Sequence, residues 1–118
     1  MRRPWGLNEA RPLTLDNSTA KPYVMSDGTF QWDDRKAAEN YANHGITFEV
    51  AREVFNDPFA LDWPDESEAY GEERYCIIGM AEGRLLFVAY TMRDDAIRII
   101  SARGAEPQER RRYHEYNA

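Results

Sequence analysis

"RYCIIGMAEGRLLFVAYTMRDDAIRIISARG", residues 74–104, decides the fold. Three apolar stretches rich in β-branched and aromatic residues are separated by two short polar connections, "AEG" at 81–83 and "RDD" at 93–95. Connections this short join neighbouring strands as hairpins, which orders the three stretches as an antiparallel meander. The sequence therefore predicts strands over residues 74–80, 84–92 and 96–103.

Shorter elements precede the meander. "TFQW" at 29–32 alternates as a short strand does, and either Asp33 or Asp34 can cap a helix that runs to His44 and stops at Gly45, a left-handed C-cap. Thr47 caps a second helix with a single apolar stripe, which "NDP" at 56–58 ends. "FALDW" at 59–63 predicts another short strand.

A last helix follows the meander at residues 107–116, with Pro107 at its first position and Glu109 near its positive end. The sequence thus predicts an α+β domain. Its antiparallel sheet consists of the three-strand C-terminal meander plus short strands, and two N-terminal helices and one C-terminal helix pack against one face.

Composition favours a single domain with a hydrated, charged surface. The chain has 118 residues, of which 42% are hydrophobic and 31% charged. Residues 1–28 contain three prolines and no sustained period, so we expect a mostly disordered extension followed by a domain over 29–118. A single cysteine cannot form an intramolecular disulfide, which fits a reducing cytoplasm, and no apolar run is long enough to span a membrane.

Charge is distributed unevenly along the chain. Residues 25–73 carry 3 basic and 13 acidic side chains, a net charge of −10, whereas the remainder carries +4 within a total of −6. This division is compatible with a polyanionic ligand on the C-terminal half and a basic partner on the other. A merely uneven surface is the alternative.

Arginines begin or end most of the meander strands. Alternation sends Arg98 to one face of the last strand and Arg103 to the other, so they form one patch only where a bulge redirects Arg103. Arg103 has an alternative role as a structural ion pair with Glu109. The full set of strand arginines is Arg74, Arg84, Arg93, Arg98 and Arg103.

The first predicted helix carries three polar side chains at intervals of four, Lys36, Asn40 and His44. They share one helix face, and a solvated surface is the alternative to a functional one. The opposite, packing side is expected to hold Ala37, Ala38, Tyr41 and Ala42. Two histidines and one cysteine do not provide a metal-binding spacing.

Three segments closely resemble the BrnT family of bacterial toxins: "FQWDDRKAAENYANHGITFEVAREVF" (30–55), "EERYCIIG" (72–79) and "GRLLFVAYTMRDDAIRIISARGAEPQERRRY" (83–113). The resemblance implies a RelE-like fold and ribonuclease activity. It also implies a BrnA-like antitoxin with a ribbon-helix-helix portion, through which alone the toxin reaches operator DNA. The chain departs from the family pattern at Asn43, usually lysine, at Met92, commonly glutamate, and at Glu106, often threonine or serine.

Metal-free RNA cleavage needs a proton acceptor, cations for the phosphorane and a donor for the leaving oxygen. Given the resemblance, no metal or other cofactor is expected, and cleavage would inhibit translation. A non-catalytic module that binds RNA or a partner is the alternative. Trp32 or Tyr90 can stack on a base, although core packing is the competing reading for both. The expected catalytic residues are Arg74, Arg93, His44 and Lys36, and the expected RNA-binding residues are Arg98, Arg103, Trp32 and Asn40.

Overall fold

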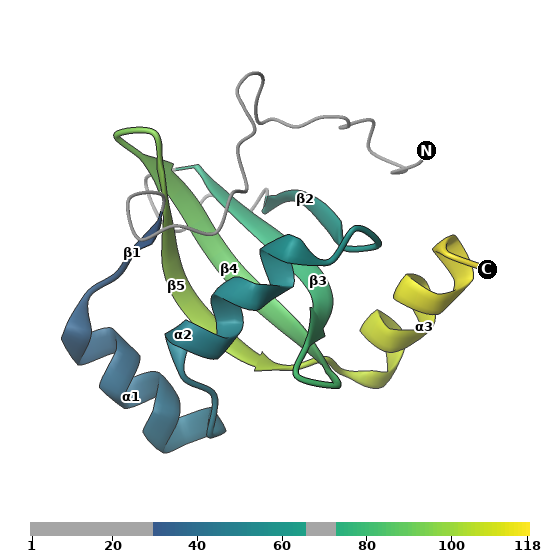
Figure 1. Cartoon of the computed structure of the whole chain (residues 1–118), viewed down its shortest axis with the longest axis horizontal. Helices are drawn as coiled ribbons and strands as arrows, with labels where there is room; N and C mark the ends of the chain where they lie inside the picture. The colour runs from purple at the N-terminus through teal and green to yellow at the C-terminus, as the bar shows by residue number, and fades with distance from the viewer. Residues whose placement is uncertain (1–29, 66–72) are drawn as a thin grey trace.

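A computed structural model describes residues 30–65 and 73–118 (Figure 1). The expected extension at 1–28 lies outside these residues. The predicted α+β class is confirmed: a five-stranded sheet of order β1-β5-β4-β3-β2 combines with three α-helices. The elements are β1 (Phe30–Gln31), α1 (Asp34–His44), α2 (Phe48–Ala51), the 3-10 helix η3 (Arg52–Asn56), β2 (Leu61–Asp65), β3 (Arg74–Ala81), β4 (Arg84–Arg93), β5 (Ala96–Gly104) and α3 (Pro107–Tyr116).

The predicted meander is present, but the sheet is mixed rather than antiparallel. β3, β4 and β5 pair as consecutive antiparallel neighbours, and β2 pairs antiparallel with β3. β1 pairs parallel with β5, with Phe30 opposite Ile97. No hairpin ties β1 to β5, because both helices and three strands intervene along the chain, so the local sequence does not set its direction.

α1, α2 and η3 cover one face of the sheet and enclose the main core (Figure 1). Phe55 packs edge-on against both Phe30 and Tyr90, with ring centroids 5.4 and 5.0 Å apart. Burying this apolar surface is the main favourable contribution to folding. The fully buried side chains of this core include Phe48, Val54, Leu86, Val88, Ile97 and Ile99.

α3 packs on the opposite face, which corrects the expectation that all helices share one face. Tyr113 of α3 joins Ile78 and Leu85 in a second, smaller core, against which Trp63 and Phe87 also pack. Ile78 and Phe87 are cross-strand partners, and their neighbours Ile77 and Val88 point into the main core. Alternation therefore gives both faces of β3 and β4 an apolar patch to bury.

A β-bulge in β5 changes which residues share a face. Ala89 pairs with Ser101 and Tyr90 with Ile99, so Ile100 is an extra residue in β5. Ile97, Ile99 and Ala102 consequently all reach the main core. Arg98, Ser101 and Arg103 therefore lie together on the opposite face, and the bulge brings the two arginines to the same side of the sheet.

The predicted helix caps are confirmed. The Asp33 carboxylate accepts hydrogen bonds from the backbone N–H groups of Arg35 and Lys36 at 2.8 and 3.1 Å, and these bonds lower the pKa of Asp33. Gly45 ends α1 with a φ of 70°, and the Thr47 hydroxyl accepts from the Val50 N–H at 3.1 Å.

The expected packing side of α1 is wrong. Asn40 is 6% exposed and faces β5, whereas Tyr41 is 58% exposed and Ala38 and Ala42 also face solvent. Only Ala37 of the expected set packs against the core. The buried residue is polar because it hydrogen-bonds β5, so the apolar residues of this helix do not mark its buried side.

Candidate active site on the arginine face

Arg74 and Arg98 lie on the same face of the sheet, on either side of Thr91. Arg98 is paired with Thr91 between β5 and β4. On the other side of β4, Tyr75 of β3 pairs with Tyr90. Because the two strands are antiparallel, the residue before Tyr75, Arg74, lies opposite the residue after Tyr90, Thr91. Two strand spacings separate Arg74 from Arg98, about 10 Å between their Cα atoms. Long guanidinium side chains at this separation can reach one phosphate group.

Arg93 belongs to the same face at the end of β4. It lies two residues beyond Thr91 and is exposed. We call Arg74, Arg93 and Arg98 the arginine face. Of the elements that the structure describes, α3 alone packs on this side of the sheet, and it contacts the opposite end, near Ile78 and Leu85.

Gln31 holds the side chain of Arg98, and Thr91 holds the backbone next to Arg74. The Arg98 Nη1 donates to the Gln31 side-chain oxygen at 3.0 Å, so a neutral amide orients the guanidinium while its charge is retained. The buried Thr91 hydroxyl donates to the carbonyl of Glu73, which fixes the start of β3 directly before Arg74. No local signal in the sequence marks Gln31, because its contact depends on the parallel pairing of β1 with β5.

The charge of Asp33 lies near this site. Beyond its two backbone hydrogen bonds, the positive charges of Arg98 and Lys36 also lower the pKa of the Asp33 carboxyl. Lys36 and Arg98 therefore both lie within electrostatic range of one carboxylate. Lys36 is exposed in the first turn of α1.

The structure separates His44 from the arginine face. His44 is exposed at the end of α1, about 12 Å along the helix axis from Lys36. The next residue, Gly45, lines a hollow together with Arg84 at the beginning of β4. Arg93 lies at the other end of this ten-residue strand. His44 and Arg93 are thus at opposite ends of the sheet.

Asn40, Trp32 and Tyr90 have structural contacts. The Asn40 amide donates to the carbonyl oxygens of Ile46 and Ala102 at 3.0 and 2.8 Å and accepts from the Ala102 N–H at 3.0 Å. Trp32 packs edge-on against Phe48 with ring centroids 5.8 Å apart. Tyr90 is buried in the main core. Trp32 and Tyr90 therefore both pack against the main core, which is the alternative to base stacking.

Arg103 is held differently from the other arginines. Its Nη1 and Nη2 donate to the two carboxylate oxygens of Glu109 at 2.9 and 3.0 Å, and the hydrogen-bonded carboxylate raises the pKa of Arg103. The cross-strand partner of Arg103 is Phe87, four residues along β4 from Thr91, a distance of about 13 Å. The alternative of an ion pair with Glu109 is therefore confirmed.

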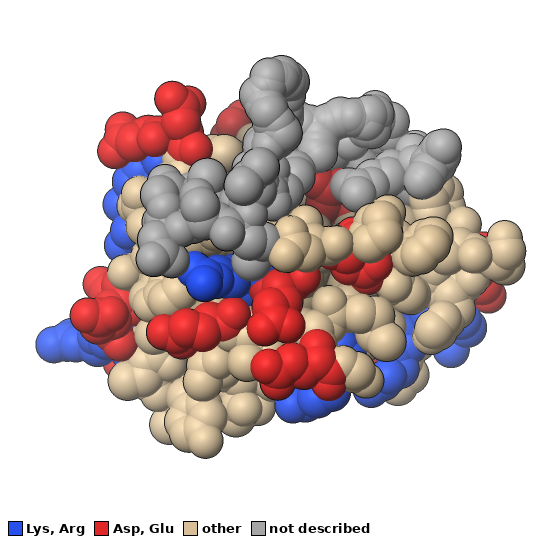
Figure 2. All heavy atoms as spheres, in the orientation of Figure 1, with Lys and Arg blue, Asp and Glu red and all other residues tan. Residues whose placement is uncertain are grey.

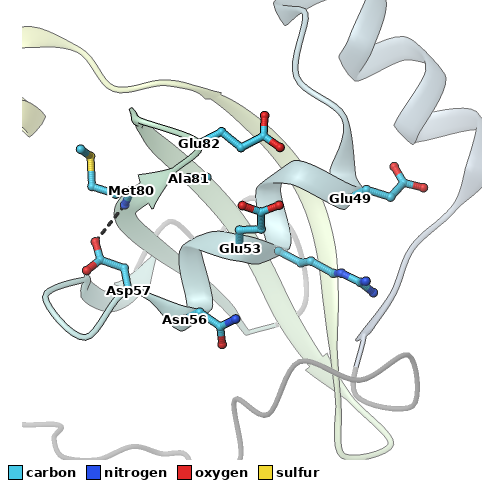
Figure 3. A pocket seen from close by; sticks show the side chains of 8 residues that line it. Glu49, Glu53, Asn56, Asp57, Met80, Ala81 and Glu82 are labelled. Atoms are coloured by element: carbon cyan, nitrogen blue, oxygen red, sulfur yellow. Dashed lines mark hydrogen bonds between the residues drawn. The ribbon is translucent and has the colours of Figure 1, made fainter.

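An acidic groove lies on the helix-covered side of the molecule. Figure 2 shows acidic side chains gathered over this side, and the close view in Figure 3 shows carboxylates from α2, η3 and the β3–β4 turn around one hollow of about 650 Å³. Asp57 anchors its rim, accepting from the Met80 N–H at 2.9 Å and the Tyr113 hydroxyl at 2.7 Å. We define the acidic groove by Glu49, Glu53, Asp57 and Glu82.

The described residues provide neither a metal-binding cluster nor a membrane-spanning helix. Within residues 30–65 and 73–118, no group of three or more histidine, cysteine, aspartate or glutamate side chains is arranged to hold a metal ion. None of the helices in the described part of the chain is long and apolar enough to cross a membrane.

Comparison with known proteins assigns the chain to a family. A comparison with curated proteins gave no match. The family model described as "Ribonuclease toxin, BrnT, of type II toxin-antitoxin system" matches residues 32–109, about two thirds of the chain. This range includes α1, the meander with its arginine face, and the beginning of α3. The chain therefore belongs to the BrnT family of ribonuclease toxins of type II toxin-antitoxin systems.

Proposed function

We propose that this toxin cleaves RNA internally and without a metal ion, and that the scissile phosphate binds at the arginine face. The observation that carries the proposal is the position of Arg74 and Arg98 on either side of Thr91, on one face of the sheet. Guanidinium groups remain charged throughout the reaction and form bidentate hydrogen bonds to phosphate oxygens. Such an arrangement favours a phosphorane over the ground-state phosphodiester.

The reaction that fits this site is attack of a ribose 2′-hydroxyl on the adjacent phosphate. The O2′–P bond forms as solvent water accepts the 2′-hydroxyl proton, and the P–O5′ bond breaks as the leaving oxygen takes up a proton. The products are a 2′,3′-cyclic phosphate and a 5′-hydroxyl. Arg74, Arg93 and Arg98 stabilise the added negative charge, and Lys36 supplies a further cation or a proton for the leaving oxygen. We omit His44 and Asn40 from this group, because His44 lies at the far end of the sheet and the Asn40 amide is buried against backbone groups.

Cleavage by purified protein tests this proposal. Folded wild-type toxin is incubated with single-stranded RNA in excess chelator, and products are resolved on a sequencing gel. We expect internal cleavage, a loss of about 100-fold or more in rate in Arg74→Ala and Arg98→Ala, and a smaller loss in Arg93→Ala. Arg84→Ala is the matched control, since Arg84 lies on β4 but points to the helix-covered face. Intact RNA at stoichiometric folded toxin contradicts the enzyme proposal and favours the RNA- or partner-binding alternative.

The same variants have an expected effect in cells. Expression of the toxin without a partner should arrest translation in the cytoplasm, and total RNA should contain new internal ends. Arg74→Ala should abolish both effects at an equal protein level, whereas Arg84→Ala should preserve them. Translation arrest without RNA cleavage would contradict the proposed mechanism.

A type II toxin has an antitoxin partner. We propose that this partner is BrnA-like, with a ribbon-helix-helix portion that carries the complex to operator DNA and a basic segment that lies in the acidic groove. Charge complementarity supports this position, because four carboxylates line the hollow against a single basic side chain, Arg52. The groove lies on the helix-covered side, so the antitoxin chain must also pass around the sheet edge to cover the arginine face.

Charge reversal tests the antitoxin position. A neighbouring gene with a ribbon-helix-helix pattern is the first supporting observation, and its product provides the binding partner. Glu49→Lys combined with Glu53→Lys should slow association and weaken the complex, most strongly at low salt. Glu39→Lys combined with Glu115→Lys, at exposed glutamates of α1 and α3 outside the groove, changes the net charge equally and is the control. Equal affinity of the two double variants would contradict docking in the acidic groove.

A further inference from the structure

Arg103 is held by an ion pair with Glu109 while its side chain stays partly exposed. Beyond its two bonds to Glu109, Nη1 also donates to the Gly104 carbonyl at 3.1 Å, and the Glu106 carboxylate lies 3.9 Å away. Its charge is therefore compensated, and the two N–H groups that face Glu109 cannot bind a phosphate without breaking that pair. The side chain nevertheless remains 30% exposed.

The Arg103 guanidinium belongs to a cluster of cationic and aromatic side chains. Its Cζ lies 4.2 Å from the centroid of the Phe87 ring beneath it. The Phe87 ring contacts the Trp63 ring edge-on at 6.0 Å, and the Arg112 guanidinium lies 5.1 Å from the Trp63 centroid. We call Trp63, Phe87, Arg103 and Arg112 the stacking platform.

The stacking platform and the arginine face lie on the same side of the sheet. Trp63, Phe87 and Arg103 alternate onto this side with Arg74 and Arg98. The row between them contains Ala89 and Ser101, whose small side chains are half-buried. The bulge residue Ile100 lies in the same interval, is half-buried and belongs to neither core. The two groups are about 13 Å apart along the strands.

We propose that the stacking platform binds an unpaired nucleobase of the RNA whose phosphate lies at the arginine face. This inference rests on the proposed function and adds a second contact of a different kind. Aromatic rings and guanidinium planes both stack on bases, and they accept any of the four because every base has a π-face. The separation of about 13 Å places that base beyond the nucleotide whose phosphate is cleaved. The substrate class is therefore single-stranded RNA, in which such a base is unstacked.

Salt dependence distinguishes a stacked base from a phosphate contact. The probe is a short single-stranded oligonucleotide with 2′-O-methyl riboses, which blocks cleavage, and with 2-aminopurine, whose fluorescence falls on stacking. Arg103→Lys keeps the charge and removes the plane. We expect it to lower affinity roughly tenfold, to leave the slope of log K against log salt unchanged, and to abolish the fluorescence quench. Arg98→Ala should instead reduce that slope by about 0.7 and preserve the quench at saturation.

A second pair of variants separates binding from folding. Phe87→Leu keeps apolar volume in the second core but removes the ring, and it should also lower affinity without changing the salt slope. Glu109→Gln still accepts the Glu106 N–H, an interaction of 2.8 Å in the wild type, but leaves only the Glu106 carboxylate, 3.9 Å away, to compensate the charge of Arg103. Its salt slope should therefore become steeper. Circular dichroism identifies any variant that fails to fold.

The two proposals fail in different ways. If Arg103→Lys and Phe87→Leu are folded and bind and quench as the wild type does, while Arg98→Ala reduces the slope, the stacking platform is contradicted and the arginine face is supported. If Arg103→Ala reduces the slope and Arg103→Lys does not lower affinity, Arg103 is a phosphate contact and the platform is again contradicted. Wild-type toxin that neither binds the oligonucleotide nor cleaves RNA contradicts both proposals.

Discussion

The side chain of Asn40 pairs with both backbone groups of Ala102, as a neighbouring strand would. Its oxygen accepts from the Ala102 N–H at 3.0 Å and its nitrogen donates to the Ala102 carbonyl at 2.8 Å. β1 ends at Gln31, beside Arg98, so the edge of β5 beyond that point has no strand partner among the described residues. One amide thereby closes a sheet edge and attaches α1 to the strand that carries Arg98 and Arg103.

Replacing Asn40 with alanine should destabilise the fold strongly. The change removes the partners of three buried backbone groups, two on Ala102 and one on Ile46, and each buried group without a partner costs about 1–3 kcal/mol. We expect the free energy of unfolding in urea to fall by about 3 kcal/mol. Asn43→Ala, at an exposed asparagine of the same helix, should change it by less than about 0.5 kcal/mol. Equal effects at the two positions would show that Asn40 does not anchor α1.

Gly79 should not tolerate a methyl group. A Cβ at this position of β3 would lie 2.8 Å from the Val54 side chain and 3.1 Å from the Val54 carbonyl oxygen, so η3 would have to move. Gly79→Ala should therefore destabilise the protein by about 1–3 kcal/mol. Gly104→Ala is the control, because the nearest atom there is the far end of Arg84 at 3.5 Å. Thermal unfolding of both variants measures the difference, and a neutral Gly79→Ala would mean that η3 is packed more loosely.

Cys76 should be an unreactive thiol in the folded protein. It is 6% exposed, and burial raises its pKa from 9.0 to about 12, with a further contribution from Asp65 and Glu109. The thiolate fraction at pH 8 is then about 1,000-fold smaller than for an unperturbed thiol. Alkylation by iodoacetamide should be slower than in concentrated urea by about 100-fold or more. Similar rates in the two conditions would contradict the burial of this side chain.

The same raised pKa makes stability depend on alkaline pH. Folding favours the neutral thiol, so its contribution is fully present below pH 9.0, the unfolded value, and decreases as the pH rises from there toward about 12. The free energy of unfolding should therefore decline above pH 9. Cys76→Ala lacks the titrating group and should show a shallower decline. Identical pH profiles would assign the decline to other groups.

A glycine in the turn between β4 and β5 should stabilise the protein. Asp94 and Asp95 have φ angles of 53° and 65°, so two non-glycine residues adopt the left-handed conformation in succession. The corresponding turn between β3 and β4 has glycine at its second position, Gly83, with a φ of 77°. Asp95→Gly should therefore raise the free energy of unfolding by about 1 kcal/mol. A variant less stable than the wild type would indicate that the Asp95 side chain makes a compensating contact.

Local signals in the sequence predicted the helices and strands well. The predictions that were wrong concern features that depend on contacts between residues far apart in the chain. The caps at Asp33, Thr47 and Gly45 depend on residues within four positions of each other, so the chain itself specifies them. The packing side of α1 was wrong because the partner of Asn40 is Ala102, 62 residues away. An amide that is buried by such a contact looks like a surface residue in the sequence.

In the candidate site, too, the sequence shows which residue types are present but not how the strand is paired. Arginines at strand ends were visible in the sequence, and alternation alone placed Arg98 and Arg103 on opposite faces. The bulge at Ile100 reverses that placement, and no residue of "IRIISAR" marks the bulge, because isoleucine is an ordinary strand residue. The ion pair of Arg103 with Glu109 was foreseeable as an alternative, since the two are only six residues apart.

The extra residue in β5 makes the length of this strand as important as its composition. If these residues paired without the bulge, strict alternation would turn Arg103 toward the helices and Ala102 outward. A deletion of Ile100 would instead remove the extra residue, so Arg98, Ser101 and Arg103 would keep their common face in a regular ladder. A β5 strand can therefore hold both arginines on one face in two ways: with four intervening residues and a bulge, as here, or with three and regular pairing.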